Sequence, residues 1–430
     1  MPDFANACAY LNGLQKFGIK LGLEQVSELL AAAGSPESRL RFIHVAGSNG
    51  KGSLSAMLSA ALCGAGFKVG LFTSPHLISP RERIRLNGAA ISEADFSELV
   101  FLLRPFADKM ALAGRCPTYF EFTTVMAALY FARYEVDWVV WETGMGGRLD
   151  STNVVIPYCS VITGIALEHQ KYLGDTIAKI AFEKAGIIKK GRPVFCGRLP
   201  DAALKVISES CREAGSQLNI VQDGDCADLQ FDISAPGYCR QSFDYEGFRI
   251  KLGLAGKFQR QNFKLAFMLL KHIAGEFSFP LENVLAGLEN VRWPARIQFM
   301  PDGSIIDGGH NPDGAAALME SLSEIFPGQK FSIVFGNFAD KDSEQILKIM
   351  SEYAEEFIFV PLQGGDRRSR TGAELSVMLG KISGVPCVAA SSIEEAMKLN
   401  VSARRLITGS LYLAGDALRM LCTEDEILNI

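Results

Sequence analysis

The chain has 430 residues, of which 48% are hydrophobic and 21% are charged, and its formal net charge is -5. This length exceeds what one hydrophobic core normally serves, so we expect two domains, and the composition excludes an intrinsically disordered chain. The acidic balance argues against a broad nucleic-acid surface, and no run of about 18 apolar residues predicts a membrane span, so we expect a cytoplasmic protein without nucleic-acid or membrane partners.

Short apolar runs alternate with longer helical patterns through the first half of the chain. Buried strands are predicted at residues 41–47, 68–73, 137–143 and 160–165, and each run ends in small or polar residues. This alternation is typical of βαβ units and a mainly parallel sheet. Ligands of such sheets bind beyond the carboxyl ends of the strands, so functional side chains are expected there.

The first predicted strand leads into a glycine-rich turn, AGSNGKGS at residues 46–53, and a helical pattern follows. A strand, such a turn and a helix start direct backbone N–H groups and Lys51 at phosphate, which indicates a nucleotide site. Val45 and Gly52 depart from the strict phosphate-loop pattern, and Gly52 stands where a hydroxyl normally helps to hold Mg²⁺. The metal ligands would then come from elsewhere; a merely structural turn is the alternative.

Three polar residues follow the next predicted strands: Ser74, Glu142 and His169. Because parallel strands end at one edge of a sheet, these side chains are candidate metal ligands. Taken singly, each is more often a polar residue that caps a strand. His44 lies inside a strand and His272 on a predicted helix, so a structural role is favoured for both.

Short alternating segments between residues 222 and 251 predict β-hairpins beside the first sheet. A second βα series follows, with strands predicted at residues 304–309, 331–336, 356–362 and 405–410. Pro294 interrupts regular structure between the two series. We therefore place the domains at residues 1–292 and 293–430.

Nine motifs occur in order along the chain: TSPHL (73–77), RERIRLNG (81–88), YFEF (119–122), ETGMGGRLDSTN (142–153), EKAGIIK (183–189), WPAR (293–296), DGGHNPDG (307–314), ADKD (339–342) and TGSLYLAG (408–415). The series resembles that of the folylpolyglutamate and dihydrofolate synthases of the Mur ligase superfamily. The resemblance implies an α/β fold, with a P-loop ATPase domain of mainly parallel sheet and a C-terminal Rossmann-like domain. It also implies a monomer that uses ATP and Mg²⁺ to join L-glutamate to a folate or to dihydropteroate through an acyl phosphate.

The resemblance implies a role for each matching residue. ATP would be bound by Gly47, Asn49, Gly50, Lys51, Gly52, Ser53, Asn262, Arg296 and Asp307. The metal would be held by Ser74, Glu142 and His169, and the catalytic residues would be Lys51, His169 and Lys184. Lys184 would be carbamylated, which turns a cation into an anion suited to lie beside Mg²⁺; an unmodified lysine on a helix is the alternative.

For the two remaining substrates the resemblance points to further residues. The folate or pteroate would meet Ile19, Lys20, Leu21, Gly22, Phe120, Leu149, Asp150 and Ser151, and the incoming glutamate would meet His310 and Ser410. Phe120 is as readily a core residue as a stacking ring. Glu168 departs from the family pattern, in which aspartate is usual, and its extra methylene is expected to shift the geometry beside His169.

Two other functions fit part of the pattern. A Mur-type ligase that adds an amino acid to a cell-wall precursor would share the ATP loop and the carbamate lysine, but TSPHL, RERIRLNG and GGRLDSTN favour the folate branch. A nucleotide-binding regulatory protein without catalysis would not need Lys51, Glu142, His169 and Lys184. Whether dihydropteroate, a reduced folate or both is the acceptor stays open.

Overall fold

The computed structural model describes residues 3–15, 22–222, 224–233, 239–363 and 368–429. These residues form two compact units. The first unit takes the described residues of Met1–Asp223 and Asn262–Leu288 together with Leu428 and Asn429, and the second takes those of Gly224–Gln261 and Glu289–Ile427. The chain therefore passes from one unit to the other several times.

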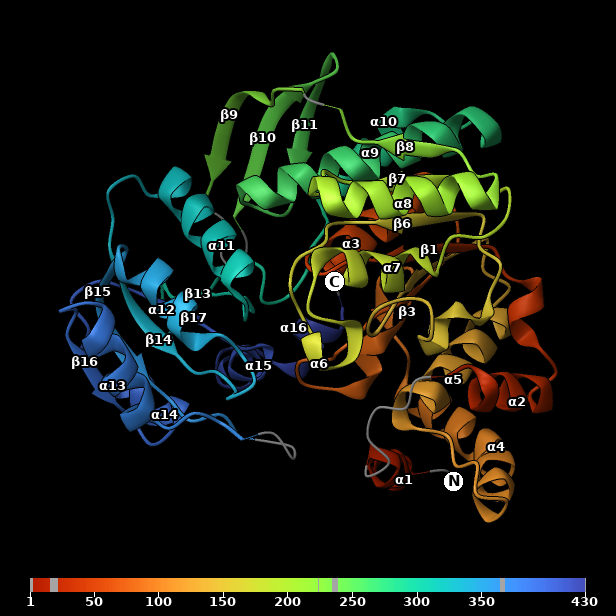
Figure 1. The fold of residues 1–430 in the computed structure, drawn as a ribbon, viewed down its shortest axis with the longest axis horizontal. Coiled ribbons are helices and arrows are strands. Elements are labelled where there is room, and N and C mark those ends of the chain that lie inside the picture. Colours follow the sequence, from red (N-terminus) through yellow and green to blue (C-terminus); the bar gives the residue numbers. More distant parts are fainter. Residues whose placement is uncertain (1–2, 16–21, 223, 234–238, 364–367, 430) are drawn as a thin grey trace. The chain divides into compact units, whose positions relative to one another are not determined.

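Eight strands of the described chain form the sheet of the first unit, in the order β4-β3-β2-β5-β1-β6-β7-β8. They are β1 (Phe42–Ala46), β2 (Val69–Phe72), β3 (Ile84–Leu86), β4 (Ala89–Ala90), β5 (Trp138–Glu142), β6 (Cys159–Ile162), β7 (Val194–Cys196) and β8 (Leu218–Ile220). Figure 1 labels β3, β1, β6, β7 and β8 of this sheet. The β2–β3 and β3–β4 pairs are antiparallel and the other pairs are parallel. The four strands predicted in this half are confirmed as β1, β2, β5 and β6, and β1, β5 and β6 are buried along their length, as strands covered on both faces are.

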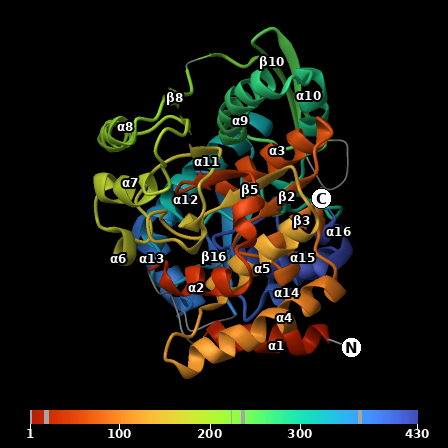
Figure 2. The same ribbon diagram turned by 90° about the vertical axis from the view of Figure 1, so that its right-hand side faces the viewer.

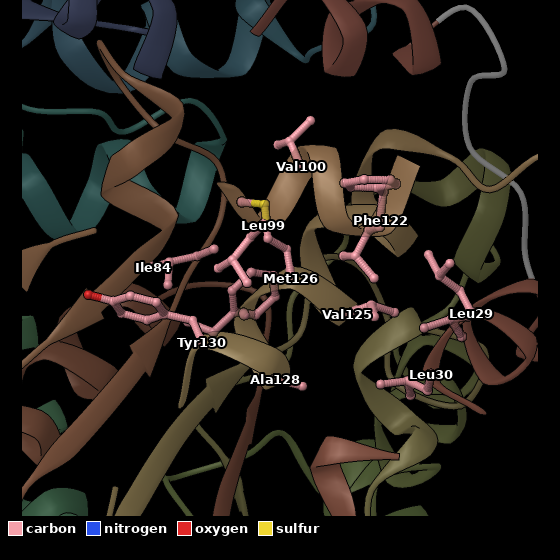
Figure 3. Packing of buried hydrophobic residues seen from close by; sticks show 14 of the residues in the cluster. Leu29, Leu30, Ile84, Leu99, Val100, Phe122, Val125, Met126, Ala128 and Tyr130 are labelled. Carbon is pink, nitrogen blue, oxygen red and sulfur yellow. The ribbon is translucent and has the colours of Figure 1, made fainter. Parts of the chain in front are cut away.

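The helices of this unit are α1 (Phe4–Gln15), α2 (Glu24–Ala32), α3 (Lys51–Gly64), α4 (Glu93–Leu112), α5 (Tyr119–Arg133), α6 (Gln170–Leu173), α7 (Ile177–Ala185), α8 (Asp201–Ala214), α9 (Lys257–Phe277) and α10 (Leu281–Glu289). α1, α2, α4 and α5 pack against one another (Figure 2). Figure 3 shows part of their core, with Leu29 from α2, Leu99 from α4 and Phe122 from α5. No helix within the described ranges combines the length and the low polarity that crossing a bilayer requires.

α5 is the central helix of this layer, because it is buried on nearly every side. It begins at a capping box, in which the Thr118 hydroxyl accepts from the Glu121 N–H at 3.2 Å and the Glu121 carboxylate accepts from the Thr118 N–H at 2.7 Å. Glu121 of the YFEF motif thus fixes where the helix starts. The start sets the position of Phe120.

The described chain ends against an edge of the first sheet. Asn429 forms an antiparallel bridge with Ala89 of β4, which is the edge strand. The Arg85 side chain is 1% exposed, and its Nη1 donates to the Leu428 carbonyl at 2.6 Å and to the Gly88 carbonyl at 3.0 Å. Leu428 and Asn429 therefore belong to the first unit.

The second unit contains two sheets in its described part. β9 (Ala227–Asp232), β10 (Arg240–Tyr245) and β11 (Phe248–Leu252) form an antiparallel sheet. The other sheet has the order β12-β13-β17-β14-β15-β16 and is parallel except for the β12–β13 pair. Its strands are β12 (Gln298–Phe299), β13 (Ile305–Ile306), β14 (Phe331–Phe335), β15 (Ala354–Phe359), β16 (Cys387–Ala389) and β17 (Arg404–Thr408), and β13, β14, β15 and β17 confirm the four predicted strands.

The helices of the second unit follow its strands. They are α11 (Pro312–Ile325), α12 (Ser343–Ser351), α13 (Gly372–Ile382), α14 (Ile393–Lys398), α15 (Leu411–Leu421) and α16 (Glu424–Leu428), whose last residue belongs to the first unit. α11, α12 and α13 pack in sequence, each against the next. Strand and helix alternate as the sequence predicts, so the second unit has the Rossmann-like α/β pattern.

The hairpins predicted beside the first sheet are instead a separate sheet of the second unit. Phe231, Cys239 and Ala255 pack into the same apolar cluster as Ile297 and Leu318. Because these side chains pack among C-terminal residues, the described chain does not divide at a single boundary after residue 292.

Candidate active site

The glycine-rich turn is held in shape by the segment that follows β6. The Thr163 hydroxyl donates to the Asn49 carbonyl at 2.6 Å, and the Ser48 hydroxyl donates to the Ala166 carbonyl at 3.1 Å while it accepts from the Ala166 N–H at 3.0 Å. Gly47 has φ +154°, and a Cβ there would lie 1.8 Å from the Thr163 Oγ1. Only glycine fits at this point of the turn.

α3 begins at the end of this turn. Gly50 is its N-cap with φ +86°, and a Cβ there would lie 2.7 Å from Oδ1 of Asn262, so Asn262 borders the turn. The Lys51 ammonium donates to the Gly47 carbonyl at 2.8 Å. Gly52 and the buried Ser53 lie in the first turn of α3, where backbone N–H groups and the helix dipole favour an anion.

Two of the three predicted metal ligands lie together. Ser74 follows β2, Glu142 ends the neighbouring parallel strand β5, and the Ser74 N–H donates to the Glu142 Oε2 at 3.1 Å. The Glu142 side chain is buried. His169 caps α6 with left-handed backbone, φ +45°. Among the His, Cys, Asp and Glu side chains of the described ranges, no three converge as a metal site.

Lys184, on α7, forms a buried ion pair with Glu168. The Lys184 Nζ lies 2.7 Å from the Glu168 Oε1, and the two side chains are 1% and 8% exposed. Burial lowers the pKa of Lys184, the Glu168 carboxylate opposes this and the Lys51 charge adds to it, so that the pKa is about 8. Burial by itself would raise the pKa of Glu168, but the charges of Lys184 and Lys51 hold it at about 2. The pair and Lys51 therefore form one charged cluster beside the turn.

The predicted acceptor residues are only partly brought together. Ile19, Lys20 and Leu21 lie outside the described residues, and Gly22 lies just before α2. The Phe120 ring stacks on Phe72 at a centroid distance of 5.8 Å.

Gly144 lies next to two of these residues, Phe120 and Asp150. A Cβ on Gly144 would lie 2.7 Å from the Phe120 ring and 3.3 Å from the Asp150 Oδ2, so the ring and the carboxylate share one corner. Leu149 and Ser151 flank Asp150 on the same loop, which follows β5.

Asp150 organises its own loop. Its Oδ2 accepts from the Met145 N–H at 2.8 Å, and its Oδ1 accepts from the Thr152 N–H at 3.0 Å and from the Thr152 hydroxyl at 2.5 Å. Burial raises the pKa of Asp150, which these donors oppose. Because both oxygens are engaged, the carboxylate holds residues 145 and 152 of the loop together.

The predicted residues of the second unit gather at the ends of β13 and β17. The buried Asp307 accepts from the Ile297 N–H at 3.0 Å and from the Gly309 N–H at 2.8 Å, and burial raises its pKa while Arg296 lowers it. The Gly409 N–H donates to the Gly309 carbonyl at 3.0 Å.

This last bond brings together the segments of His310 and Ser410. The Ser410 hydroxyl accepts from the Tyr412 N–H at 3.1 Å and so caps α15, and the His310 Nδ1 lies 3.1 Å from the Gly308 carbonyl. The two residues predicted to receive glutamate thus follow neighbouring parallel strands.

Three contacts of the site were not predicted. Thr163 supports the turn, Glu168 pairs with Lys184, and the His44 Nε2 lies 2.9 Å from the Thr152 Oγ1. Thr163 lies in the second half of the strand predicted at residues 160–165 and directly follows β6 as observed, which is a signal for its place at the sheet edge. The departure of Glu168 from the family pattern pointed to its position but not to its partner.

Known proteins resemble this chain along most of its length. The family model "Mur ligase, glutamate ligase domain" matches residues 295–411. Dihydrofolate synthase/folylpolyglutamate synthase of Bacillus subtilis (strain 168) is 36% identical over 372 residues, which cover 83% of this chain and 84% of that protein. Folylpolyglutamate synthase of Lacticaseibacillus casei is 32% identical over 423 residues, which cover 96% and 97%. The structure of Mycobacterium tuberculosis folylpolyglutamate synthase complexed with ADP and AMPPCP is 29% identical with a TM-score of 0.86, and the match covers 98% of this chain and 100% of that one.

Proposed function

We propose, from the premise that this chain belongs to the folylpolyglutamate and dihydrofolate synthase family, that it uses ATP to join L-glutamate to the carboxylate of a folate-type acid. The observation that carries the proposal is the charged cluster of Lys51, Glu168 and Lys184 beside a turn built for phosphate. The family also includes enzymes named dihydrofolate synthetase, so dihydropteroate is a second candidate acceptor. A cell-wall acceptor is less favoured, because the relatives named above are folate enzymes.

The nucleotide would bind at the turn and at the start of α3. Gly47, Asn49, Gly50, Lys51, Gly52 and Ser53 would surround its phosphates, with Asn262 alongside. A helix start favours negative charge, and the Lys51 ammonium adds a cation at the turn. Arg296 and Asp307 would contact the rest of ATP.

Ser74, Glu142 and His169 would hold Mg²⁺. The buried Glu142 carboxylate beside Ser74 fits a divalent cation, because carboxylate and hydroxyl oxygens are the ligands that Mg²⁺ prefers. When bound, the metal would offset the charge on the phosphoryl oxygens during transfer.

The reaction would proceed in two displacements. A carboxylate oxygen of the acceptor attacks the γ-phosphorus and ADP leaves, which gives an acyl phosphate. The glutamate amine, placed by His310 and Ser410, then attacks the acyl carbon; a C–N bond forms, phosphate leaves with the C–O bond electrons, and the amine gives up a proton. Lys51 would stay near the transferred group, where electrostatic stabilisation contributes most of the rate.

Lys184 would act as a carbamate. A pKa of about 8 leaves about one Nζ in ten neutral at pH 7, far more than an exposed lysine would have. The neutral Nζ attacks CO₂, an N–C bond forms, and the nitrogen releases one proton. With ¹³C-labelled bicarbonate, NMR should show a carbamate signal in the wild type and in Lys189→Arg but not in Lys184→Arg; a wild type without the signal refutes the modification.

One product assay tests the proposed function. The protein is given ATP, labelled L-glutamate and, separately, dihydropteroate, tetrahydrofolate or a muramoyl-peptide precursor, and products are identified by mass spectrometry. Ligation of glutamate to a pteroate-type acid, absent in Lys51→Ala, is the expected result. A product only from the muramoyl precursor would support the Mur-type alternative, and ATP binding without turnover on any acceptor would support a regulatory protein.

A further inference from the structure

His44 lies in the middle of β1 and is fully buried. Its Nε2 is 2.9 Å from the Thr152 Oγ1, and the Thr152 hydroxyl is 2.5 Å from the Asp150 Oδ1. The Asp150 oxygens also accept two backbone N–H groups, so the carboxylate is the acceptor and the Thr152 hydroxyl donates to it. The hydroxyl oxygen then accepts from His44, which must carry its proton on Nε2.

Packing alone does not explain a histidine at this position. The other ring nitrogen, Nδ1, is buried without a hydrogen-bond partner. An unpaired buried acceptor is unfavourable, and an apolar side chain of similar size would avoid it. Burial lowers the pKa of His44 to about 3, so the ring is neutral and supplies no charge. What the imidazole adds here is the Nε2–H bond to Thr152.

That bond reaches the corner shared by Phe120 and Asp150, two residues that the resemblance assigns to the folate or pteroate. Thr152 is fixed on two sides, since its carbonyl also accepts from the Trp141 Nε1 at 3.0 Å. Thr152 and Met145 are the two points at which Asp150 closes its loop, and Gly144, next to Met145, lies against the Phe120 ring. The shape of residues 144–152 therefore depends on where β1 places His44.

We propose that His44 is a positioning residue for the acceptor: through Thr152 and Asp150 it holds the loop of residues 144–152 in the shape that the pteroate-type ring meets. The inference rests on the proposed function for the identity of the acceptor. The hydrogen bonds from which it is argued, His44 to Thr152 and Thr152 to Asp150, lie within this chain and do not depend on which acceptor binds.

Steady-state kinetics of His44→Leu and His44→Gln test the proposal. His44→Leu removes the donor, so KM for the acceptor should rise about tenfold, which corresponds to one hydrogen bond, while KM for ATP and for glutamate stays within about twofold. A glutamine amide can donate to Thr152, so His44→Gln should recover most of the loss. An equal rise in KM for ATP, or no recovery with glutamine, would overturn the proposal.

Ser160→Ala is the matched control. Ser160 pairs in register with His44 on β6, is fully buried, and donates to the Ile187 carbonyl at 2.8 Å. Its loss should lower stability without a selective rise in KM for the acceptor.

If His44→Leu does not fold, Thr152→Val replaces it as a substitution of the same shape, and Thr152→Ser is its rescue. Hydrogen exchange gives a readout that does not depend on catalysis: the Met145 and Thr152 amides should exchange at least about tenfold faster in Thr152→Val than in wild type. Unchanged exchange would refute the positioning role. A wild type that makes no pteroate product would refute the proposed function but leave this measurement valid.

Discussion

In the chain with Lys184 unmodified, its ion pair with Glu168 is buried, and removal of Glu168 leaves the Lys184 cation without compensation. We expect Glu168→Gln to lower the free energy of unfolding by about 3 kcal/mol. Glu209→Gln, which breaks the exposed pair with Arg212, should leave it nearly unchanged. Urea unfolding followed by circular dichroism measures both variants. Similar small changes in the two would show that the buried pair contributes little.

The same pair predicts how stability depends on pH. The pKa of Glu168 is about 2 in the folded chain and 4.5 ordinarily, so the unfolded chain binds this proton first. The stabilisation is complete above pH 4.5 and is lost as the pH falls from 4.5 towards 2. Urea unfolding at about pH 5, 4 and 3 should show a steeper loss in wild type than in Glu168→Gln. Parallel pH profiles would contradict the shift.

His169 combines a proposed ligand with a left-handed backbone, which disfavours side chains other than glycine. His169→Gly should therefore keep the free energy of unfolding or raise it by up to about 1 kcal/mol, while ligation falls about 100-fold or more because the imidazole is gone. Ser35→Gly, at φ +48°, is the matched control and should keep activity. Thermal unfolding and the product assay measure the two effects, and retained ligation in His169→Gly would remove His169 from the metal site.

The position of a single residue could be predicted from the sequence where the residue stands at the end of a predicted parallel strand. Ser74 and Glu142 follow adjacent parallel strands, and they meet. Thr163 and Asn49 are 114 positions apart, and their contact depends on the packed sheet. The partner of Glu168 likewise depends on how α7 packs, which no local pattern encodes.

At the scale of elements, the turn between β1 and α3 predicts an effect of one added methyl group. Gly47→Ala would bring a Cβ to 1.8 Å from the Thr163 Oγ1, so the turn must move and nucleotide affinity should fall about tenfold or more. Gly13→Ala is the control: Gly13 lies inside α1 with no atom near its added Cβ, so it should gain about 0.5–1 kcal/mol of stability and bind nucleotide normally. Calorimetric titration with ADP measures the nucleotide affinity of both variants. Normal affinity in Gly47→Ala would contradict the claim that the turn tolerates only glycine at this position.

Strands were found where apolar runs predicted them, because a buried parallel strand has a strong local pattern. The hairpins of β9, β10 and β11 were also predicted as strands, but beside the wrong sheet. Alternating polarity reports that a strand has one buried face; it does not report what covers that face. Here the cover is the C-terminal cluster around Ile297.

For the whole molecule, the division of the described chain into two units that each combine distant segments predicts how a fragment behaves. A fragment of residues 1–292 would carry Phe231 and Ala255 without Ile297 and Leu318, and it would lack Leu428, which Arg85 binds. We expect it to bind an apolar fluorescent dye strongly and to unfold without a sharp transition. The full-length chain is the control. A fragment that unfolds cooperatively and binds no dye would support a simple boundary after residue 292.

The bridge between Asn429 and Ala89 also bears on solubility. An uncovered edge strand presents free N–H and C=O groups to any other strand, and such edges promote aggregation. β4 is short, and the returning chain end covers part of it. Removal of the residues from Leu428 onward would therefore leave this edge open to self-association.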